Sequence, residues 1–410
     1  MIDRKYFKLV ENELSKEEIT VLLGTRRVGK TTILENLYNS IEDKKKVFLT
    51  FDDIEVLSLF ENNEKLFKEQ YVDQNDIIFI DEIQYSKESG RILKFLFDTT
   101  KKKFFISGSS IPDISINSLS YLVGRIRIFN IFPITFEEFV KYKAKNKFFL
   151  FDKKREINDF NQLNLEFEEY LKYGSYPKII ISELNDKEKI LKDLTNTYLL
   201  KEVKEILEYK NIFEFEKFLT HIALIDGKLV NKSSISQELE INRNSISEMI
   251  EVLNNTFIIY EVKPYLKNKI KEQIKSSKIY FQDLGFKNSL MKNFSDYEKR
   301  LDKGEILENF VLNQLIRNDY EVKFWNYKNR YEMDFVIEKN GEIIGIECKS
   351  KLKNDSLTTS TKEFIKEYTP KKVYILNLSL DSVTNFENTS IEFTSYYNLI
   401  SILNNKLLFQ

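Results

Sequence analysis

The chain has very little cysteine and histidine. One cysteine, Cys348, cannot form a disulfide within the chain, and one histidine, His221, cannot complete a Cys/His zinc site with it. Any metal ion is therefore expected to be a hard cation held by carboxylates and phosphates. A single histidine also leaves little scope for histidine acid–base chemistry, so His221 is assigned no functional role.

Long apolar runs and an excess of one charge are also absent. No run approaches the roughly 18 residues of a membrane helix, and 42% hydrophobic with 31% charged residues is typical of a globular protein. The amino terminus shows no apolar signal core, so we expect a cytoplasmic protein without a membrane partner. With 63 basic and 64 acidic residues, the net charge of −1 provides no global attraction to nucleic acid.

Glycine and proline are scarce too, at 11 and 5 residues, which makes each glycine motif more informative. A length of 410 residues predicts two or three domains. We place them at residues 1–145, 146–290 and 291–410. The first boundary falls in a basic stretch with little periodic pattern, residues 141–154.

The strongest motif follows a short apolar run at residues 19–23, which is typical of a buried parallel strand. Residues 24–31 fit the pattern G-x-x-x-x-G-K-[ST], and helical spacing continues behind them. In this context backbone N–H groups surround phosphate oxygens, Lys30 reaches the β and γ phosphates, and the Thr31 hydroxyl binds Mg²⁺. The predicted nucleotide-binding residues are Gly24, Thr25, Arg26, Arg27, Val28, Gly29, Lys30, Thr31, Thr32 and Ser109.

Two carboxylates follow the apolar strand predicted at residues 77–80. In a P-loop protein an acidic residue here holds Mg²⁺ and a following glutamate polarises the attacking water, so Asp81 is assigned to the metal and Glu82 to catalysis. A further strand predicted at residues 104–107 leads to Ser109, which with Ser107 would lie near the γ-phosphate. Because no N-K-x-D tetrapeptide reads guanine, the predicted nucleotide is ATP.

With the Gly108-Ser109-Ser110 turn, Gly124-Arg125 and residues 133–139, these motifs resemble a family of prokaryotic AAA-type ATPases. The resemblance implies a five-stranded parallel sheet with an extra strand between the P-loop strand and the metal-site strand. It also makes Arg125 a candidate catalytic residue that stabilises transition-state charge, which in trans would require an oligomer. A surface salt bridge is the alternative for Arg125. Thr135 and Glu138 predict a capping box at a helix start.

The middle of the chain predicts helices at residues 233–239 and 244–253, separated by a short turn and followed by a hairpin, which is a winged-helix pattern. The second helix carries Arg243 and Asn244 but also Glu248 and Glu251, so DNA reading and protein contact both stay open. The lysines at residues 263–278 would either meet phosphates or form a solvated charge run. The glycine–proline corner at residues 173–177 is interpreted as structural.

Near the carboxyl terminus, predicted strands at residues 332–338 and 342–349 flank Asn340-Gly341, a strong hairpin signal. With a two-residue turn, Asp334 lies directly opposite Glu347. Directly opposed residues have Cβ atoms roughly 4.5–5.5 Å apart, where two carboxylates favour a cation between them. With Lys349 on the same face, this arrangement predicts a Mg²⁺ site suited to phosphodiester hydrolysis.

This pattern resembles the PD-(D/E)xK nuclease superfamily, with Asp334, Glu347 and Lys349 as the catalytic motif and Glu308 as a further metal ligand. The whole chain resembles archaeal and bacterial ATP-binding proteins that join an AAA-type ATPase to a winged-helix and nuclease-like carboxy-terminal half. The implied fold class is α/β: a parallel-sheet P-loop domain, a helical winged-helix domain and a restriction-endonuclease-like domain. The predicted metal ligands are Thr31, Asp81, Glu308, Asp334 and Glu347.

Two functions are compatible with these features. The first is an Mg²⁺-dependent ATPase coupled to the binding or processing of DNA or another nucleic acid through the carboxy-terminal half. The second is an ATP-dependent regulatory switch that binds a protein partner and carries an inactive nuclease-like fold. Salt-sensitive DNA binding would distinguish them, because affinity from phosphate contacts falls steeply with salt.

Overall fold

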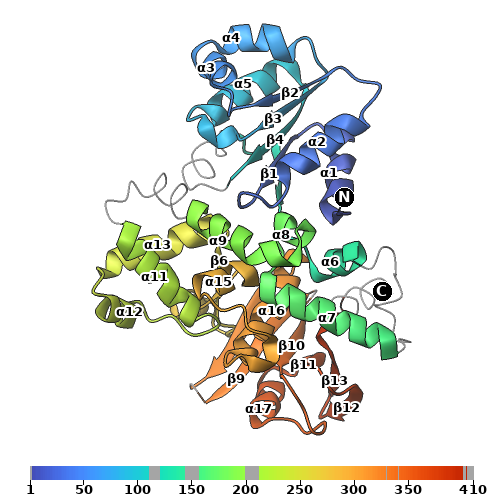
Figure 1. Cartoon of the computed structure of the whole chain (residues 1–410), viewed down its shortest axis with the longest axis vertical. Coiled ribbons are helices and arrows are strands. Elements are labelled where there is room, and N and C mark those ends of the chain that lie inside the picture. The colour runs from blue at the N-terminus through green and yellow to red at the C-terminus, as the bar shows by residue number, and fades with distance from the viewer. Residues whose placement is uncertain are drawn as a thin grey trace.

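Two β-sheets lie at opposite ends of the long axis, with most of the helices of the middle of the chain between them (Figure 1). The structure is a computed structural model and describes residues 2–109, 121–143, 157–198, 212–328, 330–339, 341–399 and 403. The predicted boundary at residue 145, Ser110 of the predicted turn and Asn340 of the predicted hairpin lie outside these ranges. Within them, no helix is both long and apolar enough to cross a membrane.

The N-terminal sheet has five parallel strands in the order β2-β3-β4-β1-β5. Its strands are β1 (Ile19–Leu23), β2 (Lys46–Thr50), β3 (Ile77–Asp81), β4 (Lys103–Gly108) and β5 (Ile126–Asn130). Because β4 lies between β1 and β3, the predicted strand order is confirmed. The parallel strands bring the P-loop, which follows β1, and Asp81, which ends β3, to the same edge of the sheet.

Helices cover both faces of this sheet. They are α1 (Lys5–Glu11), α2 (Lys30–Ser40), α3 (Ile54–Asn62), α4 (Glu64–Phe67) and α5 (Ser89–Thr100). On β1, Leu22 packs into the core with Leu34 of α2, whereas Val21 packs into the opposite core with Leu96 of α5. The strand is therefore buried on both faces, which explains why its sequence is apolar at almost every position.

The middle of the chain is mainly helical. Its elements are α6 (Phe136–Lys143), α7 (Ile157–Tyr173), α8 (Pro177–Ile181), α9 (Lys187–Thr197), α11 (Ile212–Leu224), α12 (Lys232–Leu239), α13 (Arg243–Asn255), β6 (Ile259–Val262), α14 (Lys269–Ile274), β7 (Lys278–Phe281) and α15 (Leu284–Leu290). Both predicted helices at residues 233–253 are present as α12 and α13, and the antiparallel pair β6–β7 follows them.

The predicted capping box is also present, because Thr135 N donates to Glu138 Oε2 at 2.8 Å and Glu138 N donates to Thr135 Oγ1 at 3.2 Å.

The turn after α7 ties this helix to α15. Gly174 has φ +73°, and a Cβ atom there would lie 2.2 Å from Asp283 Oδ1. Asp283 accepts hydrogen bonds from the N–H and the hydroxyl of Ser175 at 2.7 and 2.6 Å, and it also caps α15 through Phe286 N. A side chain at position 174 would displace this carboxylate, so glycine is required at the corner.

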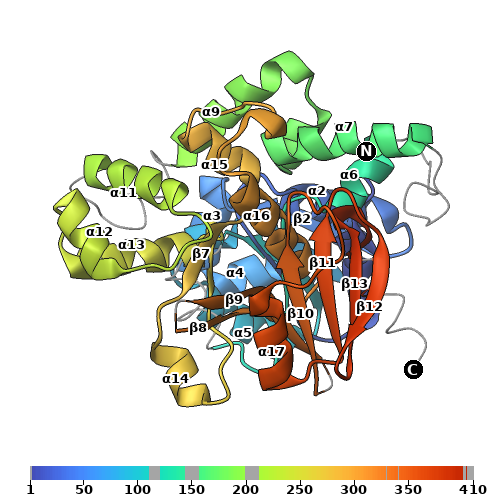
Figure 2. The same ribbon diagram turned by 90° about the horizontal axis from the view of Figure 1, so that it is seen from below.

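The C-terminal sheet has six strands in the order β12-β13-β11-β10-β9-β8 and is mixed (Figure 2). Its elements are α16 (Lys303–Arg317), β8 (Val322–Tyr327), β9 (Tyr331–Lys339), β10 (Glu342–Cys348), α17 (Thr359–Tyr368), β11 (Lys372–Asn377), β12 (Ser382–Phe386) and β13 (Thr389–Ser395). The pairs from Glu342↔Lys339 to Ile346↔Phe335 confirm the predicted β9–β10 register. Regular pairing ends there, one pair before Glu347 and Asp334.

Packing crosses the predicted domain boundaries. The ring of Phe136, at the start of α6, lies 5.6 Å from that of Phe310 on α16 and 6.0 Å from that of Tyr397, centroid to centroid. The fully buried Arg317, at the end of α16, donates to Ile134 O at 2.8 Å and to Ser175 Oγ at 2.9 Å. The segment that follows the N-terminal sheet therefore packs directly against the carboxy-terminal half.

Candidate nucleotide site and carboxylate cluster

The P-loop occupies residues 24–29 between β1 and α2. Gly29 has φ +97° and directly precedes the first helical residue, Lys30, so the free N–H groups of the helix terminus face the loop. The amine of Lys30 is buried and donates to the carbonyls of Gly24 and Thr25 at 2.8 and 2.9 Å. A positive charge and a helix N-terminus thus converge where phosphate groups of a nucleotide would lie.

Thr31 and Asp81 meet at the carboxyl edge of the sheet. Thr31 Oγ1 donates to Asp81 Oδ2 at 2.8 Å, and the Ser107 hydroxyl donates to the other carboxylate oxygen. Two further hydroxyls in this region, Thr25 Oγ1 and Ser109 Oγ, are buried and have no hydrogen-bond partner within the described part of the chain. A hydroxyl and a carboxylate in contact, with unsatisfied polar groups nearby, fit an Mg²⁺–triphosphate.

Glu82 lies one residue beyond the sheet in a left-handed conformation, with φ +57°. The Gln84 side-chain amide donates to Glu82 Oε2, and Gln84 Oε1 accepts from Ser109 N at 3.1 Å. Gln84 therefore connects the predicted catalytic carboxylate to the end of β4. Sequence reasoning did not identify Gln84, although an amide two residues after an acidic pair at a strand end is a usable local signal.

Arg125 lies at the opposite edge of the sheet from the P-loop. Its carbonyl accepts from Ile19 N at 2.8 Å, at the amino end of β1, and the five residues of that strand separate it from the loop by roughly 15 Å. Its guanidinium donates to both carboxylate oxygens of Asp98, at 2.8 and 3.0 Å, and this hydrogen bonding lowers the pKa of Asp98. The structure does not bring Arg125 to the P-loop of its own chain and shows the surface salt bridge instead.

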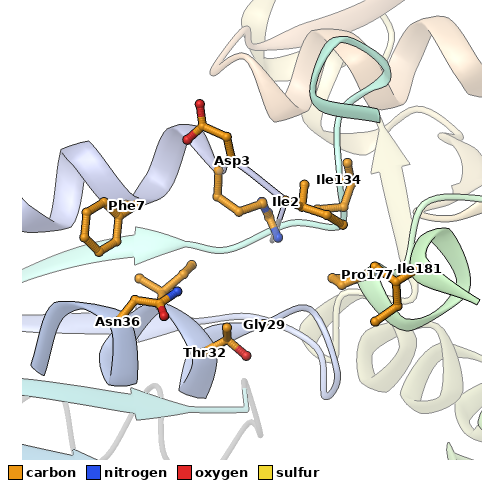
Figure 3. A pocket seen from close by; sticks show the side chains of 11 residues that line it. Ile2, Asp3, Phe7, Gly29, Thr32, Asn36, Ile134, Pro177 and Ile181 are labelled. Atoms are coloured by element: carbon orange, nitrogen blue, oxygen red, sulfur yellow. The ribbon is translucent and has the colours of Figure 1, made fainter. Parts of the chain in front are cut away.

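A cavity of about 600 Å³ opens beside the P-loop (Figure 3). Gly29 and Thr32 form one wall, and Pro177 and Ile181 of α8 face them across the cavity, while Ile134 and the N-terminal segment close other sides. A largely apolar cavity next to a phosphate site suits the base of a nucleotide. Sequence reasoning identified Gly29 and Thr32 but missed the lining residues of the N-terminal segment, Ile134 and α8, because these come from three separate segments of the chain.

Arg4 holds the N-terminal segment against this site. Its guanidinium donates to Val28 O in the P-loop at 2.9 Å and to Phe132 O at 2.6 Å, and it forms an ion pair with Glu138 at 3.4 Å. The side chain is buried, so these contacts replace its hydration. Arg4 thus joins the P-loop to the start of α6 and was not predicted from the sequence.

In the C-terminal sheet the structure places Lys349 beside Glu347, with Lys349 Nζ 2.8 Å from Glu347 Oε1. The buried Glu347 also accepts hydrogen bonds from Thr361 and Thr358 at the start of α17. Asp334 Oδ2 accepts instead from Cys348 N at 2.7 Å. The two predicted metal-binding carboxylates therefore have different protein donors.

Glu308 meets a lysine that was not part of the prediction. Lys278, the first residue of β7, forms an ion pair with Glu332 and lies 3.7 Å from Glu308 Oε2, which also accepts from the Tyr280 hydroxyl at 3.0 Å. Desolvation raises the pKa of Asp334 well above its ordinary value, and the charges of Glu308 and Glu347 raise it further.

Burial alone would lower the pKa of Lys278, but Glu308, Glu332 and Asp334 raise it overall, so the amine is held as an ammonium. Within the described residues, no three His, Cys, Asp or Glu side chains are arranged to hold a metal ion. Glu308, Asp334 and Glu347 are therefore not assembled as the predicted metal site, and Lys278 lies beside Glu308.

Comparison with known proteins matches three segments of the chain to family models. Residues 16–140 match a model described as an AAA domain, and residues 164–297 and 303–396 match two domains of unknown function, DUF8612 and DUF4143. With the P-loop and the order of the parallel strands, the first match shows that the N-terminal part resembles an AAA-type P-loop domain.

Two relatives come from the archaeon Methanocaldococcus jannaschii. The uncharacterized protein MJ1544 is 29% identical over 357 residues, which cover 82% of this chain and 76% of the relative. The uncharacterized protein MJ1637 is 25% identical over 338 residues, which cover 76% and 70%.

Two solved structures are similar at a low level. The replication initiator DnaA bound to AMPPCP and single-stranded DNA has a TM-score of 0.32 and 16% identity, covering 62% of this chain and 90% of that one. The Thermotoga maritima RuvB Holliday junction branch migration motor has a TM-score of 0.32 and 17% identity, covering 64% and 90%.

Proposed function

We propose that the protein is an Mg²⁺-dependent ATPase whose nucleotide state controls its carboxy-terminal half, and that this half acts on nucleic acid. The observation that carries the proposal is the contact between Thr31 Oγ1 and Asp81 Oδ2 at 2.8 Å, at the edge where the P-loop presents the buried Lys30. Bound Mg²⁺ would be held by Thr31 and Asp81 and would offset negative charge on the phosphates.

The remaining residues of the site have separate tasks. Lys30 would exchange its two loop carbonyls for phosphate oxygens, and Glu82, oriented by Gln84, would position the attacking water. The base would lie in the cavity between Thr32 and Ile181. ATP is preferred as the nucleotide because the chain has no guanine-reading tetrapeptide.

The cavity assignment predicts a selective effect on nucleotide affinity. Ile181→Glu places a carboxylate on the cavity wall, where it loses apolar contact and repels the phosphates, so the KM for ATP is expected to rise about tenfold with little change in kcat. Steady-state phosphate release measures both constants. Leu184→Glu is the matched control, because Leu184 is similarly exposed, 56% against 59%, and does not line the cavity. Equal effects of the two substitutions would contradict the placement.

The arrangement of the remaining elements supports the finer parts of the proposal. The order α11, α12, α13, β6 and β7 supports a winged-helix module. The order α16, β8, β9, β10, α17 and β11 supports a PD-(D/E)xK-like fold, and residues 1–145, 146–290 and 291–410 remain our proposed domain ranges.

A basic surface around α14 supports a nucleic-acid partner. This helix lies at the edge of the molecule in Figure 2, and the exposed lysines on and beside it are Lys267, Lys269, Lys271 and Lys275. Ile270 and Ile274 are also exposed there, at 78% and 79%. Apolar side chains among lysines suit contact with bases beside a phosphate backbone.

Reversing two of these charges is expected to weaken DNA binding. Lys271→Glu with Lys275→Glu should lower affinity roughly tenfold or more and reduce the slope of log affinity against log salt by about 2. Fluorescence anisotropy with labelled DNA at several salt concentrations measures both quantities. Lys189→Glu with Lys192→Glu, two exposed lysines of α9, is the control. Equal loss in the two double variants would point to general charge rather than to this surface.

Contacts between the two halves support control by the nucleotide. Ile134 lines the cavity, and its carbonyl and the Ser175 hydroxyl both accept from Arg317 at the end of α16. The same helix carries Glu308 in the carboxylate cluster. A change in the cavity therefore has a continuous packed route to the carboxy-terminal site.

The second candidate is a switch that binds a protein partner. The exposed face of α13 favours it, because Arg243 and Asn244 lie beside Glu248 and Glu251 rather than among further basic residues. In this alternative the nuclease-like fold is inactive and ATP controls access of the partner to the middle helices. An arginine finger from Arg125 acting on a neighbouring copy would belong to either function and would require an oligomer.

The proposal is tested by phosphate release from ATP with Mg²⁺, with and without DNA, while the same DNA is examined for cuts. We expect hydrolysis that increases when DNA is added. Hydrolysis indifferent to DNA, with weak and salt-independent DNA binding, would favour the protein-partner switch. An absence of hydrolysis under every condition would refute the ATPase assignment.

A further inference from the structure

One lysine from the middle of the chain reaches into the carboxylates of the C-terminal sheet. Lys278 begins β7 and is paired on both sides, with Val262 of β6 and with Leu229 through an isolated bridge. Its side chain is only 7% exposed. The backbone on both sides thus fixes the position from which its amine extends.

The amine contacts one carboxylate that was predicted to bind a metal ion, Glu308, and a second that was not, Glu332. Lys278 Nζ forms an ion pair with Glu332 and lies 3.7 Å from Glu308 Oε2. Asp334 lies two residues after Glu332 on β9 and therefore on the same face of the sheet. Tyr280, two residues after Lys278, donates its hydroxyl to Glu308 Oε2 at 3.0 Å. One strand therefore supplies both an ammonium and a hydroxyl to this cluster.

The cluster also borders open space. A cavity of about 420 Å³ lies between the segment around Gly227 and the start of α16, and Lys278, Glu308 and Glu332 line it. A hydrated ion can approach these carboxylates through this cavity. The amine of Lys278 lies on the same cavity wall as the carboxylates that such an ion would bind.

We propose that Lys278 is a tethered cation that takes the place of a divalent metal ion beside Glu308 and Asp334, so that its ammonium and a metal ion compete for these carboxylates. The inference rests on the proposed role of this cluster and adds its regulation. It accounts for the absence of an assembled metal site among the described residues, because the ammonium already offsets the charge that a metal ion would offset.

Competition between the two cations has a simple electrostatic basis. An ammonium and a divalent ion seek the same carboxylate oxygens and repel each other at short range. Lys349 differs from Lys278, because it directly follows β10, pairs with Glu347 of the same strand and is 36% exposed.

Mn²⁺ binding to the full chain without nucleotide, measured by calorimetry and by electron paramagnetic resonance, tests the inference. Lys278→Gln is expected to lower the Kd for Mn²⁺ at least about tenfold relative to wild type. Lys278→Arg should retain the wild-type Kd because it keeps the charge. Lys228→Gln is the matched control. Lys228 lines the same cavity, but its side chain is 59% exposed and its amine lies 4.0 Å from a different carboxylate, that of Glu305. Adding Asp334→Asn to Lys278→Gln should remove the gain.

Equal Mn²⁺ affinity in wild type and Lys278→Gln would overturn the proposal that Lys278 competes with a metal ion. The carboxylates could then still bind a metal ion beside Lys278. No Mn²⁺ binding in any variant would overturn both the competition by Lys278 and the binding of metal by this cluster. The ATPase proposal is tested separately, by phosphate release. Lys278→Met, which preserves most of the side-chain volume, repeats the test if Lys278→Gln has lost its native circular dichroism spectrum.

Discussion

Replacing Lys30 with alanine is expected to slow ATP hydrolysis by at least about 10²–10³-fold. The buried amine already lies inside the P-loop, on the carbonyls of Gly24 and Thr25 at 2.8 and 2.9 Å. Phosphate oxygens would take over these two hydrogen bonds, and the positive charge would then stabilise negative charge that develops during transfer. Alanine removes the charge while the glycines and Thr31 keep the shape of the loop.

Phosphate release and nucleotide binding should be measured together for Lys30→Ala. Lys44→Ala is the matched control, because Lys44 is an exposed lysine in the same sheet domain and is not part of the loop. The control should keep the wild-type rate. A wild-type rate in Lys30→Ala would mean that hydrolysis does not arise at the P-loop, and the whole assignment of this site would fail.

Lys287→Met is expected to destabilise the fold by about 3–5 kcal/mol. Lys287 Nζ lies 3.2 Å from Asp226 Oδ2, and both side chains are almost completely buried, at 2% and 1% exposure. Asp226 also accepts from Phe281 N and from the Asn309 side chain, so it connects the turn after α11 to β7 and to α16. Methionine fills the space of the lysine stem but leaves the carboxylate buried without its cation.

Unfolding in denaturant and by heat measures this loss, with a midpoint expected to fall by roughly 10 °C. Burial raises the pKa of Asp226 while Lys287 lowers it, so removing the lysine raises the pKa further and the deficit should shrink as pH falls and the carboxyl becomes neutral. Asp226→Asn added to Lys287→Met should recover much of the stability. Lys299→Met, at a lysine that is 75% exposed, is the control. A loss at position 287 no larger than at 299 would show that the buried pair contributes little.

The regular elements were predictable where the sequence pattern is strongly periodic. β1, β3 and β4 are apolar at nearly every position because they are buried on both faces, and α12 and α13 carry clear helical spacing. β12 and β13 were missed. β12 alternates between partly buried and exposed positions at the edge of the sheet, so its side chains show little of the apolar pattern that a central strand requires.

The predicted sites divide in the same way. The P-loop, Asp81 and Glu82 are adjacent to strand ends, so local spacing and parallel strand direction suffice to bring them together. Arg125 does not lie where its motif predicted, because it directly precedes β5 at the far edge of the sheet, where it pairs with Asp98. The β9–β10 register was also predictable, yet the carboxylates of Asp334 and Glu347 face different donors once the regular pairing ends.

The sequence by itself determined the phosphate-binding motif and the hairpin register, because each depends on residues close together in the chain or on a repeating pattern, whereas the strand order was implied by the resemblance to a family. Only the tertiary structure decided what surrounds these sites. Arg4, Pro177 and Ile181 reach the cavity beside the P-loop from separate segments, and Lys278 reaches Glu308 from a different sheet. Contacts between residues so far apart in the sequence cannot be read from local spacing. They form when distant segments pack to bury their apolar faces, which also brings their polar side chains together.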